Sequence, residues 1–484
     1  MERYFPVLRA LGLLLTLFSL TLLVPLATAH LLDDGAKSAY DLAFLVTLGS
    51  GLALWFVTYR FKRELNVRDG FLLVVLAWSV LPLFAAIPFY TQLDINFTRA
   101  YFEAASGLTA TGASALSHID ALPTSINLWR HLIIWLGGMG LIVLAVAILP
   151  MLGIGGRQMF KAETPSPMKD TKLTPRIAQT AKGLWLIYVG ITSTCALAYH
   201  WAGMSGFDAV CHAFSTVSLG GFSTHDQSFA YWNSPLVEGI AIFFMLIAGM
   251  NFSTHYIAVL NRDARAYLRD PEILWFLVVL FASVLFITFY LWGFHAYDTS
   301  THTLRYTAFN LISIATTAGF TNIDYSLWPF FAPLWMLFLC SFVSCSGSTG
   351  GGIKMMRAVL LYKQVYRELL RAMHPNAVHP VKLGGHSVPQ NMLFAVLAFS
   401  FIYMVSLVTL TLILSFSGLE IITAFSAAVA SLNNTGPGLG QVGPAGSYAM
   451  LNDFQLWVCT FAMLLGRLEI FTLLVVLTPA FWRK

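Results

Sequence analysis

Four short stretches of the chain each carry a glycine at a place where backbone carbonyl oxygens could bind a cation. Aligned on Gly112, Gly221, Gly319 and Gly436, they read YFEAASGLTATGAS, VCHAFSTVSLGGFS, AFNLISIATTAGFT and FSAAVASLNNTGPG. Glycine accepts left-handed backbone, which costs other residues about 1–2 kcal/mol. Four such turns around one axis would form a ring of carbonyl oxygens able to replace the hydration shell of an ion.

The residues before each glycine predict a short apolar helix that enters the membrane and stops near its centre. The C-terminal end of such a helix carries about half a negative charge, which favours a cation. Three positions before the glycine stands a hydroxyl or amide side chain, which could bind the turn or the ion: Thr109, Ser218, Thr316 and Asn433. Small residues also permit close helix packing, but four copies in register favour a pore.

A second feature lies in the sequence CSGSTGGGI, which includes Gly347, Gly350, Gly351 and Gly352. Successive glycines cost about 1 kcal/mol each in a helix, so we expect an apolar span to break here. The sequence is not a nucleotide-binding P-loop, because it lacks the final Gly-Lys-Ser/Thr. The alternatives are a packing kink and a flexible loop inside the membrane.

Arg467 lies within the last apolar stretch. A central arginine costs about 2.5–3.5 kcal/mol on insertion scales, so it normally faces a cavity or a partner. Glu469 is two residues away, on another helix face. One alternative is an ion pair with a carboxylate of another helix. The other places Arg467 in the pore, bonded to the glycine-rich loop.

The elements that position these residues are membrane spans. The 484 residues are 57% hydrophobic and 11% charged, less than half the charged share of typical soluble domains. Ten stretches are long enough to cross a bilayer. They are 10–30, 39–58, 70–89, 131–153, 184–203, 235–260, 273–294, 329–360, 392–416 and 454–479. We expect one of them, 329–360, to be broken.

The basic residues agree with ten spans and cytoplasmic termini. With that topology 23 of the 28 Lys and Arg lie inside, four outside, and Arg467 within a span, as the positive-inside rule requires. The outer loops carry ten acids, which would concentrate cations there. The first span could instead be a signal peptide ending at ATA, but its apolar run is longer than usual, and a retained helix is favoured.

The composition excludes several classes. No basic stripe is large enough for nucleic acid, the five cysteines have no disulfide spacing, and the histidines show no metal-ligand motif. No cluster of catalytic residues is present, so we expect no enzyme and no organic cofactor.

The sequence resembles the Trk/Ktr/HKT superfamily of potassium transporters, most closely the bacterial Trk-type membrane subunit. The resemblance covers essentially the whole chain. It rests on the four turns, on GGMG followed by LIVLAVAILP, and on PMKD, SGSTGGGIK, HPNA, NNTGPG and LGRLEIF. The resemblance implies that K⁺ is the transported ion and that the selectivity filter consists of Thr111, Gly112, Gly220, Gly221, Ala318, Gly319, Thr435 and Gly436. It also supports a gating role for the glycine-rich loop.

The resemblance further implies an all-α polytopic fold of four tandem helix–pore-loop–helix modules around one pore. The expected divisions are an extra two-helix domain (1–66), pore module 1 (67–156), a cytoplasmic linker (157–182), pore module 2 (183–265), pore module 3 with a broken inner helix (266–372), a second linker (373–389) and pore module 4 (390–484). The two linkers are interpreted in the first place as solvated basic surfaces on the cytoplasmic side. They are also candidate docking surfaces for a cytosolic regulator.

The expected partners are a second copy of the chain, membrane lipids and a cytosolic ring of regulatory subunits that bind a nucleotide of the NAD or ATP type. The expected location is the bacterial inner membrane. The alternative function is an inverted-repeat secondary transporter, a K⁺/H⁺ or Na⁺ symporter. Four tandem units with only one broken helix favour the channel-like protein.

Overall fold

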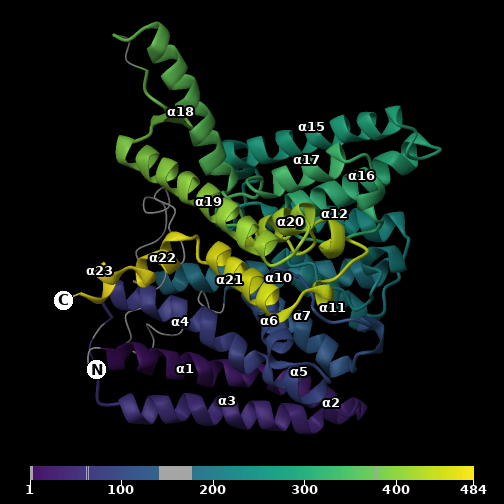
Figure 1. Ribbon diagram of the computed structural model, residues 1–484, viewed down its shortest axis with the longest axis vertical. Helices are drawn as coiled ribbons and strands as arrows, with labels where there is room; N and C mark the ends of the chain where they lie inside the picture. Colours follow the sequence, from purple (N-terminus) through teal and green to yellow (C-terminus); the bar gives the residue numbers. More distant parts are fainter. Residues whose placement is uncertain (1–3, 62, 64, 141–176, 377–378, 484) are drawn as a thin grey trace.

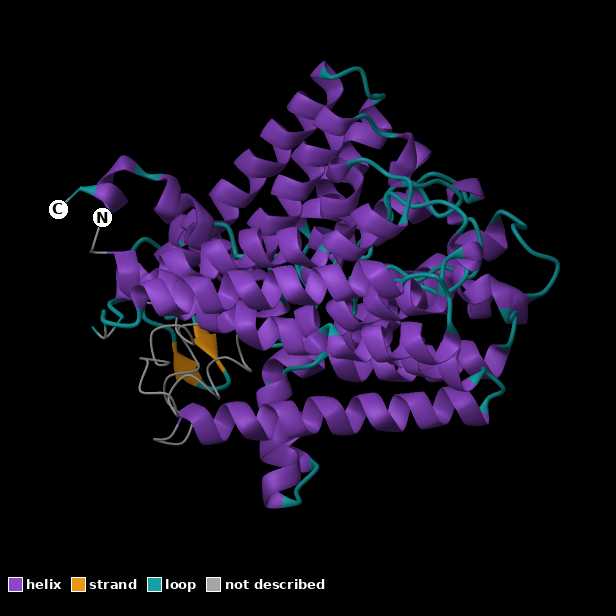
Figure 2. Ribbon diagram, turned by 90° about the horizontal axis from the view of Figure 1, so that it is seen from below, coloured by secondary structure: helices purple, strands orange, loops and turns teal. Residues whose placement is uncertain are grey.

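The structure is a computed structural model that describes residues 4–61, 63, 65–140, 177–376 and 379–483. These residues are almost entirely helical (Figure 1), which confirms the predicted all-α class. Beside the helices there is one small hairpin of β1 (Lys382–Leu383) and β2 (His386–Ser387). Figure 2 shows this hairpin at the edge of the molecule where the two termini also lie.

The chain begins with an antiparallel pair of helical segments. The first consists of α1 (Phe5–Thr21) and α2 (Leu23–Leu32), and the second is α3 (Lys37–Thr58). Gly12 and Gly51 allow α1 and α3 to touch, because a Cβ added at Gly12 would lie 2.8 Å from the carbonyl oxygen of Gly51. Small residues at such crossings are typical of helix pairs in membranes.

Four units of similar order follow. Each has an outer helical segment, a short helix that leads into a glycine turn, and an inner helical segment. The outer segments are α4 (Val67–Ala85) with α5 (Ile87–Gln92), α10 (Ile177–Trp201), α15 (Pro271–Gly293) and α19 (Gln390–Phe416). The short helices, which we call pore helices, are α6 (Phe97–Leu108), α11 (Gly206–Ser218), α16 (Ser300–Ala315) and α20 (Ile421–Leu432).

The inner segments are α7 (Thr124–Met139), α12 (Pro235–Gly249) with α13 (Phe252–Asn261), α17 (Phe331–Cys340) with α18 (Met355–Met373), and α21 (Asp453–Arg467) with α22 (Phe471–Leu477). Short helices α14 (Arg265–Arg269) and α23 (Pro479–Trp482) complete the described α-helices. Loops between pore helices and inner segments carry the 3₁₀ turns η2 (Ile119–Ala121), η4 (Ser228–Tyr231), η5 (Tyr325–Leu327), η6 (Gly440–Val442) and η7 (Tyr448–Met450).

The membrane spans differ in part from the prediction. By length and composition, six described helical segments could cross a bilayer, or eight if two sharply bent pairs count as spans. The predicted span 235–260 bends by 92° between α12 and α13, and 454–479 bends by 112° between α21 and α22. The prediction of a single broken helix was therefore wrong. The second half of 131–153 and most of the linker 157–182 lie outside the described residues.

Local chemistry explains the two bends. The side chain of Asn251 accepts a hydrogen bond from the backbone N–H of Ser253 at 2.9 Å, which starts α13 as a new capped helix. After α21, Glu469 and Ile470 both have positive φ, +50° and +57°, which cannot continue a right-handed helix. Hydropathy does not predict either bend, because both bends lie within apolar sequence.

The predicted span 329–360 does divide at its glycine-rich part. Helix α17 has only ten residues, and α18 begins at Met355 after an irregular loop. Figure 1 shows α18 projecting away from the body of the molecule, whereas both termini lie together on one side. We refer to residues 344–354 as the glycine-rich loop.

Candidate functional site: a closed ring of four glycine turns

Each pore helix ends in the same local structure. The backbone N–H of the residue before the turn glycine donates to the carbonyl five residues earlier, at 2.8–2.9 Å in all four units. The residue two positions before the glycine is left-handed in each case: Ala110, Leu219, Thr317 and Asn434. This is the Schellman arrangement that commonly terminates helices. The turn glycines then have φ of +76°, +74°, +79° and +91°, which favours a residue without Cβ.

The four turns contact one another in cyclic order. A Cβ added at Gly112 would lie 1.8 Å from the carbonyl oxygen of Gly220, and one at Gly221 would lie 2.4 Å from that of Ala318. The circle continues from Gly319 to the carbonyl oxygen of Thr435, at 2.2 Å, and from Gly436 back to that of Thr111, at 2.7 Å. The structure thus brings together all eight residues predicted as the filter, and side chains at the glycines would collide with backbone.

The polar residues three positions before each glycine bond mainly to neighbouring protein. The hydroxyl groups of Thr109 and Thr316 donate to carbonyls one helical turn earlier, at 2.8 and 2.7 Å. Asn433 accepts a hydrogen bond from the hydroxyl of Tyr403 at 2.9 Å. In the described structure these side chains hold the pore helices, so of the two predicted roles, binding the turn fits better.

The glycine-rich loop lies against the C-terminal ends of three pore helices. The hydroxyl of Thr349 donates to the carbonyl of Val217 at 3.1 Å, and that of Ser344 to the carbonyl of Thr316 at 3.1 Å. A Cβ at Gly351 would lie 1.9 Å from the carbonyl oxygen of Asn433. The loop therefore covers carbonyls at the negative ends of these helices.

One buried carboxylate binds both the first part of the glycine-rich loop and the start of α18 that follows it. A single oxygen of Glu272 accepts hydrogen bonds from the backbone N–H of Ser346 at 2.6 Å and of Met356 at 3.0 Å. Within the loop, Gly347 and Gly352 have φ of +75° and +81°. A Cβ at Gly350 would lie 2.9 Å from the carbonyl oxygen of Thr316. The glycines thus serve backbone conformation and close approach.

Arg467 connects the glycine-rich loop to the first unit. Its guanidinium donates to the carbonyl of Thr349 at 3.2 Å, to that of Gly138 at 2.9 Å and to that of Gly137. The group also lies 5.4 Å from the ring centroid of Trp78. Of the two predicted environments, this matches contact with the loop. The neighbouring Glu469 pairs with Arg357.

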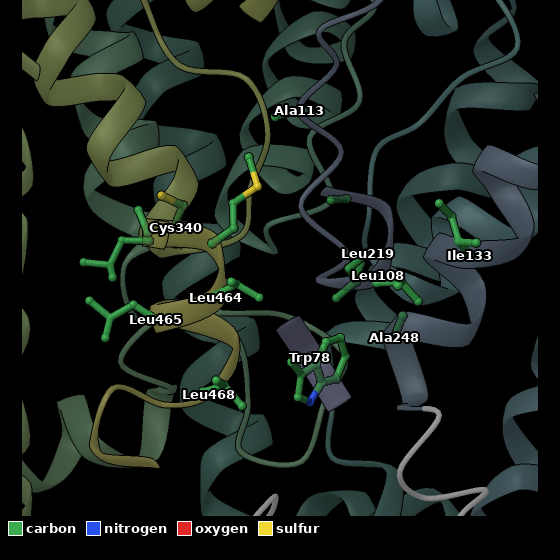
Figure 3. Close-up of a cluster of buried hydrophobic side chains, with 14 of the residues drawn as sticks. Trp78, Leu108, Ala113, Ile133, Leu219, Ala248, Cys340, Leu464, Leu465 and Leu468 are labelled. Atoms are coloured by element: carbon green, nitrogen blue, oxygen red, sulfur yellow. The ribbon is translucent and has the colours of Figure 1, made fainter. Parts of the chain in front are cut away.

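Apolar side chains from several units pack around these contacts. Figure 3 shows Leu108 and Leu219 close together near Trp78, with Leu464, Leu465 and Leu468 from the fourth unit nearby. All belong to one buried hydrophobic cluster. The five cysteines are also buried and free.

Arg130, one of the four basic residues that the prediction assigns to the outer side, is fully buried in α7 and pairs with the equally buried Glu103 of α6 at 2.8 Å. Glu103 was not identified as a candidate at all. The available signal was an acid within an apolar pore-helix sequence, since ionisable residues in membranes normally have a specific role.

The loops after turns 1 and 2 form an acidic surface. The carboxylate of Asp226 accepts from the N–H of Ile119 at 3.0 Å, and the N–H of Asp226 donates to Asp120 at 3.0 Å. Desolvation raises the pKa of Asp120, but hydrogen bonds from Asp226 and His225 outweigh it and hold this pKa below its ordinary value. Asp120 is therefore an anion at neutral pH.

Comparison with known proteins identifies relatives over nearly the full length. The model of a family described as "TrkH: Cation transport protein" matches residues 37–484. The Trk system potassium uptake protein TrkH of Salmonella typhimurium is 46% identical over 478 residues, which cover 98% of this chain and 99% of the relative. The Trk system potassium uptake protein TrkG of Escherichia coli is 36% identical, with 98% of this chain and 97% of the relative covered.

A solved structure has the same fold. The crystal structure of the potassium transporter TrkH from Vibrio parahaemolyticus matches with a TM-score of 0.90 at 44% sequence identity. The match covers 99% of this chain and 100% of that one.

Proposed function

The chain belongs to the TrkH family of cation transport proteins, a family of transporters and not of enzymes, and we propose that it takes up potassium ions by channel-like conduction through the ring of glycine turns. Thr111, Gly112, Gly220, Gly221, Ala318, Gly319, Thr435 and Gly436 form the selectivity filter in this proposal. K⁺ is the transported ion, and no organic cofactor is required.

The observation that carries the proposal is the cyclic contact of the four turns. Each turn glycine lies against the carbonyl of the next unit, so four equivalent backbone segments surround one axis. Carbonyl rings of this kind can replace the hydration shell of a cation. Only one glycine is common to all four turns, so we expect fewer ion sites and weaker discrimination against Na⁺ than in a filter with several shared positions.

Electrostatics support cation entry. The C-terminal ends of four pore helices meet at the turns, and their partial negative charges favour a cation there. The carboxylates of Asp120 and Asp226 lie in the loops beyond the first two turns. A membrane potential supplies about 2.3 kcal/mol per charge per 100 mV, which suffices in principle to drive uptake.

We further propose that the glycine-rich loop is the gate. Gly347, Gly350, Gly351 and Gly352 give it the backbone freedom to move. Its contacts with Val217 and Thr316 at the ends of two pore helices, and with Arg467 of α21, support this role. Arg467 would hold the loop and set a positive barrier below the filter.

The proposed setting is the bacterial inner membrane, with both termini in the cytoplasm. The proposed division into domains is the one predicted from the sequence, with pore modules starting at residues 67, 183, 266 and 390. The partners would be membrane lipids, a second copy of the chain and a cytosolic ring of nucleotide-binding regulatory subunits. The name "Trk system" carried by the relatives supports association with further components.

A second candidate is K⁺/H⁺ or Na⁺ symport by a secondary transporter. The bends between α12 and α13 and between α21 and α22 favour it, since broken helices are common in such transporters. Reversal potentials separate the two, because a channel follows the K⁺ gradient alone, whereas a symporter also responds to an imposed H⁺ or Na⁺ gradient.

The test of the main proposal is uptake of Rb⁺ or K⁺ by cells that lack their own uptake systems, and by liposomes containing the purified full chain. We expect saturable uptake that a cytosolic partner modifies. No flux in either system would reject the proposal.

A further inference from the structure

Behind each glycine turn, a polar side chain of the pore helix holds the chain that leaves the turn. We call these four side chains the rear clamps: Glu103, His212 and Asn310, each nine positions before the turn glycine, and Ser426, ten positions before it. Each bonds to a residue two or three positions after the glycine. The local turns are alike, but the rear clamps are chemically different.

The clamp distances are those of ordinary hydrogen bonds. The contacts are Ser114 Oγ and the Ala115 N–H to Glu103 (both 3.0 Å), His212 Nε2 with Ser223 Oγ (2.9 Å), Asn310 Nδ2 to Asn322 Oδ1 (2.6 Å), and the Leu439 N–H to Ser426 Oγ (2.9 Å). Three of these contacts involve no carboxylate or guanidinium group.

The first rear clamp is different because it belongs to an ion pair. Glu103 and Arg130 are both completely buried, with 2.8 Å between Oε1 and Nε. Arg130 also donates to the side-chain oxygen of Asn127 at 3.2 Å. Burying two charges is costly and is repaid only by excellent geometry and further hydrogen bonds. A hydrogen-bonding pair of neutral residues would suffice for packing, so the charges need a further explanation.

Arg130 reaches from the first turn to the second. It donates to the carbonyl of Ser223 at 3.2 Å and to the hydroxyl of Ser114 at 3.4 Å, and its guanidinium lies 4.3 Å from the ring centroid of Phe222. Phe222 and Ser223 directly follow Gly221, and Ser114 stands two residues after Gly112. The ion pair therefore spans the gap behind the closest contact of the ring, between Gly112 and Gly220.

The segments that follow the other turns are joined, among the described residues, by hydrogen bonds of backbone groups and of a tyrosine hydroxyl. The N–H of Phe229 donates to the carbonyl of Thr321 at 2.9 Å, which links units 2 and 3. The hydroxyl of Tyr325 donates to the carbonyl of Gly438 at 3.4 Å, which links units 3 and 4. The N–H of Tyr448 donates to the carbonyl of Ser114 at 3.1 Å and closes the circle from unit 4 to unit 1.

We propose that Glu103 and Arg130 are positioning residues that set the separation of turns 1 and 2 and thereby the discrimination between K⁺ and Na⁺. The inference rests on the proposed function, in which the ring is the filter. Neither residue touches the ion, since both are fully buried behind the turns. The ring of carbonyls replaces the hydration shell of the ion, so a shift of turn 1 relative to its neighbour turn 2 changes how well a dehydrated ion is held. A change behind these turns therefore alters selectivity before it alters total flux.

The experiment compares Glu103→Gln with the matched control Glu238→Gln. Glu238 is also buried and pairs with Arg305 at 2.8 Å, but it joins α12 to α16 away from the turns. Full-length proteins in liposomes are measured for the K⁺/Na⁺ permeability ratio. We expect a several-fold fall for Glu103→Gln and an unchanged ratio for Glu238→Gln. A folded Glu103→Gln protein with the wild-type ratio would overturn the inference.

Two more variants decide the matter if Glu103→Gln does not fold. Ser114→Ala keeps both charges and removes the hydroxyl that links them to the first turn. The double variant Glu103→Gln, Arg130→Gln removes both charges, so that none is left buried alone. We expect a lowered permeability ratio in both, and wild-type ratios in both would refute the positioning role. If wild-type liposomes carry no K⁺, the proposed function itself fails.

Discussion

The four turn glycines offer a graded test of the filter, because the space around them differs. A Cβ would lie 1.8 Å from a neighbouring carbonyl oxygen at Gly112 but 2.7 Å away at Gly436. Real Cβ atoms keep at least 3.0 Å, so alanine at position 112 must displace this oxygen by about 1.2 Å, which distorts the ring of carbonyls that would replace the hydration shell. At position 436 the displacement is only a few tenths of an ångström.

Alanine is also strained by the positive φ at every turn. Non-glycine residues lose about 1–2 kcal/mol in left-handed backbone, and this loss is the same wherever the site lies. Gly418 supplies the matched control, since its φ is +97° and nothing lies within 4 Å of an added Cβ. We expect Gly418→Ala to lower stability by that amount and to leave selectivity intact.

The expected result is a ranking. Gly112→Ala should reduce the K⁺/Na⁺ permeability ratio at least about tenfold, equivalent to about 1.4 kcal/mol, and Gly436→Ala should reduce it least among the four. The assay is the reversal potential in mixed K⁺/Na⁺ solutions, with the amount of folded protein as reference. A wild-type ratio for folded Gly112→Ala, or the reverse ranking, would refute the assignment of these turns as the filter.

Three further outcomes are expected. Deleting residues 347–352 should raise ion flux and weaken control by a cytosolic partner; a variant as tightly closed as wild type in flux assays would contradict the gate. Arg467→Gln should raise conductance severalfold, because the loop loses its bond at Thr349; unchanged conductance with less folded protein would indicate a structural role instead. Asp120→Asn should lower the stability of the protein at neutral pH but not at acidic pH. The folded state lowers the pKa of Asp120, so its carboxylate stabilises the fold at pH values above the pKa of the unfolded chain, and this stabilisation is lost as the pH falls through the folded pKa. Thermal unfolding of both proteins across pH checks this, and an equal difference in stability at acidic and neutral pH would disprove it.

Much of the local structure could be predicted from the sequence because it depends on near neighbours. The Schellman ends and the left-handed glycines use contacts within six residues, so four aligned copies predicted the four turns. Apolar length likewise predicted the outer segments such as α15 and α19. The bends after Gly249 and Arg467 were missed, since an apolar run indicates that a segment can lie in the membrane but does not indicate the direction of its helix.

The sequence by itself determined the class of protein and the residues of the candidate filter. Tertiary structure alone decided the cyclic order of the turns, the contacts of Arg467 and the ion pair behind turns 1 and 2. The carbonyl of Gly220 meets Gly112 across more than a hundred residues of chain. Glu103 finds Arg130 only when α6 packs against α7. The repeated sequence specifies the local backbone structure of each unit. The energy of a buried charge depends instead on which atoms tertiary packing brings next to it.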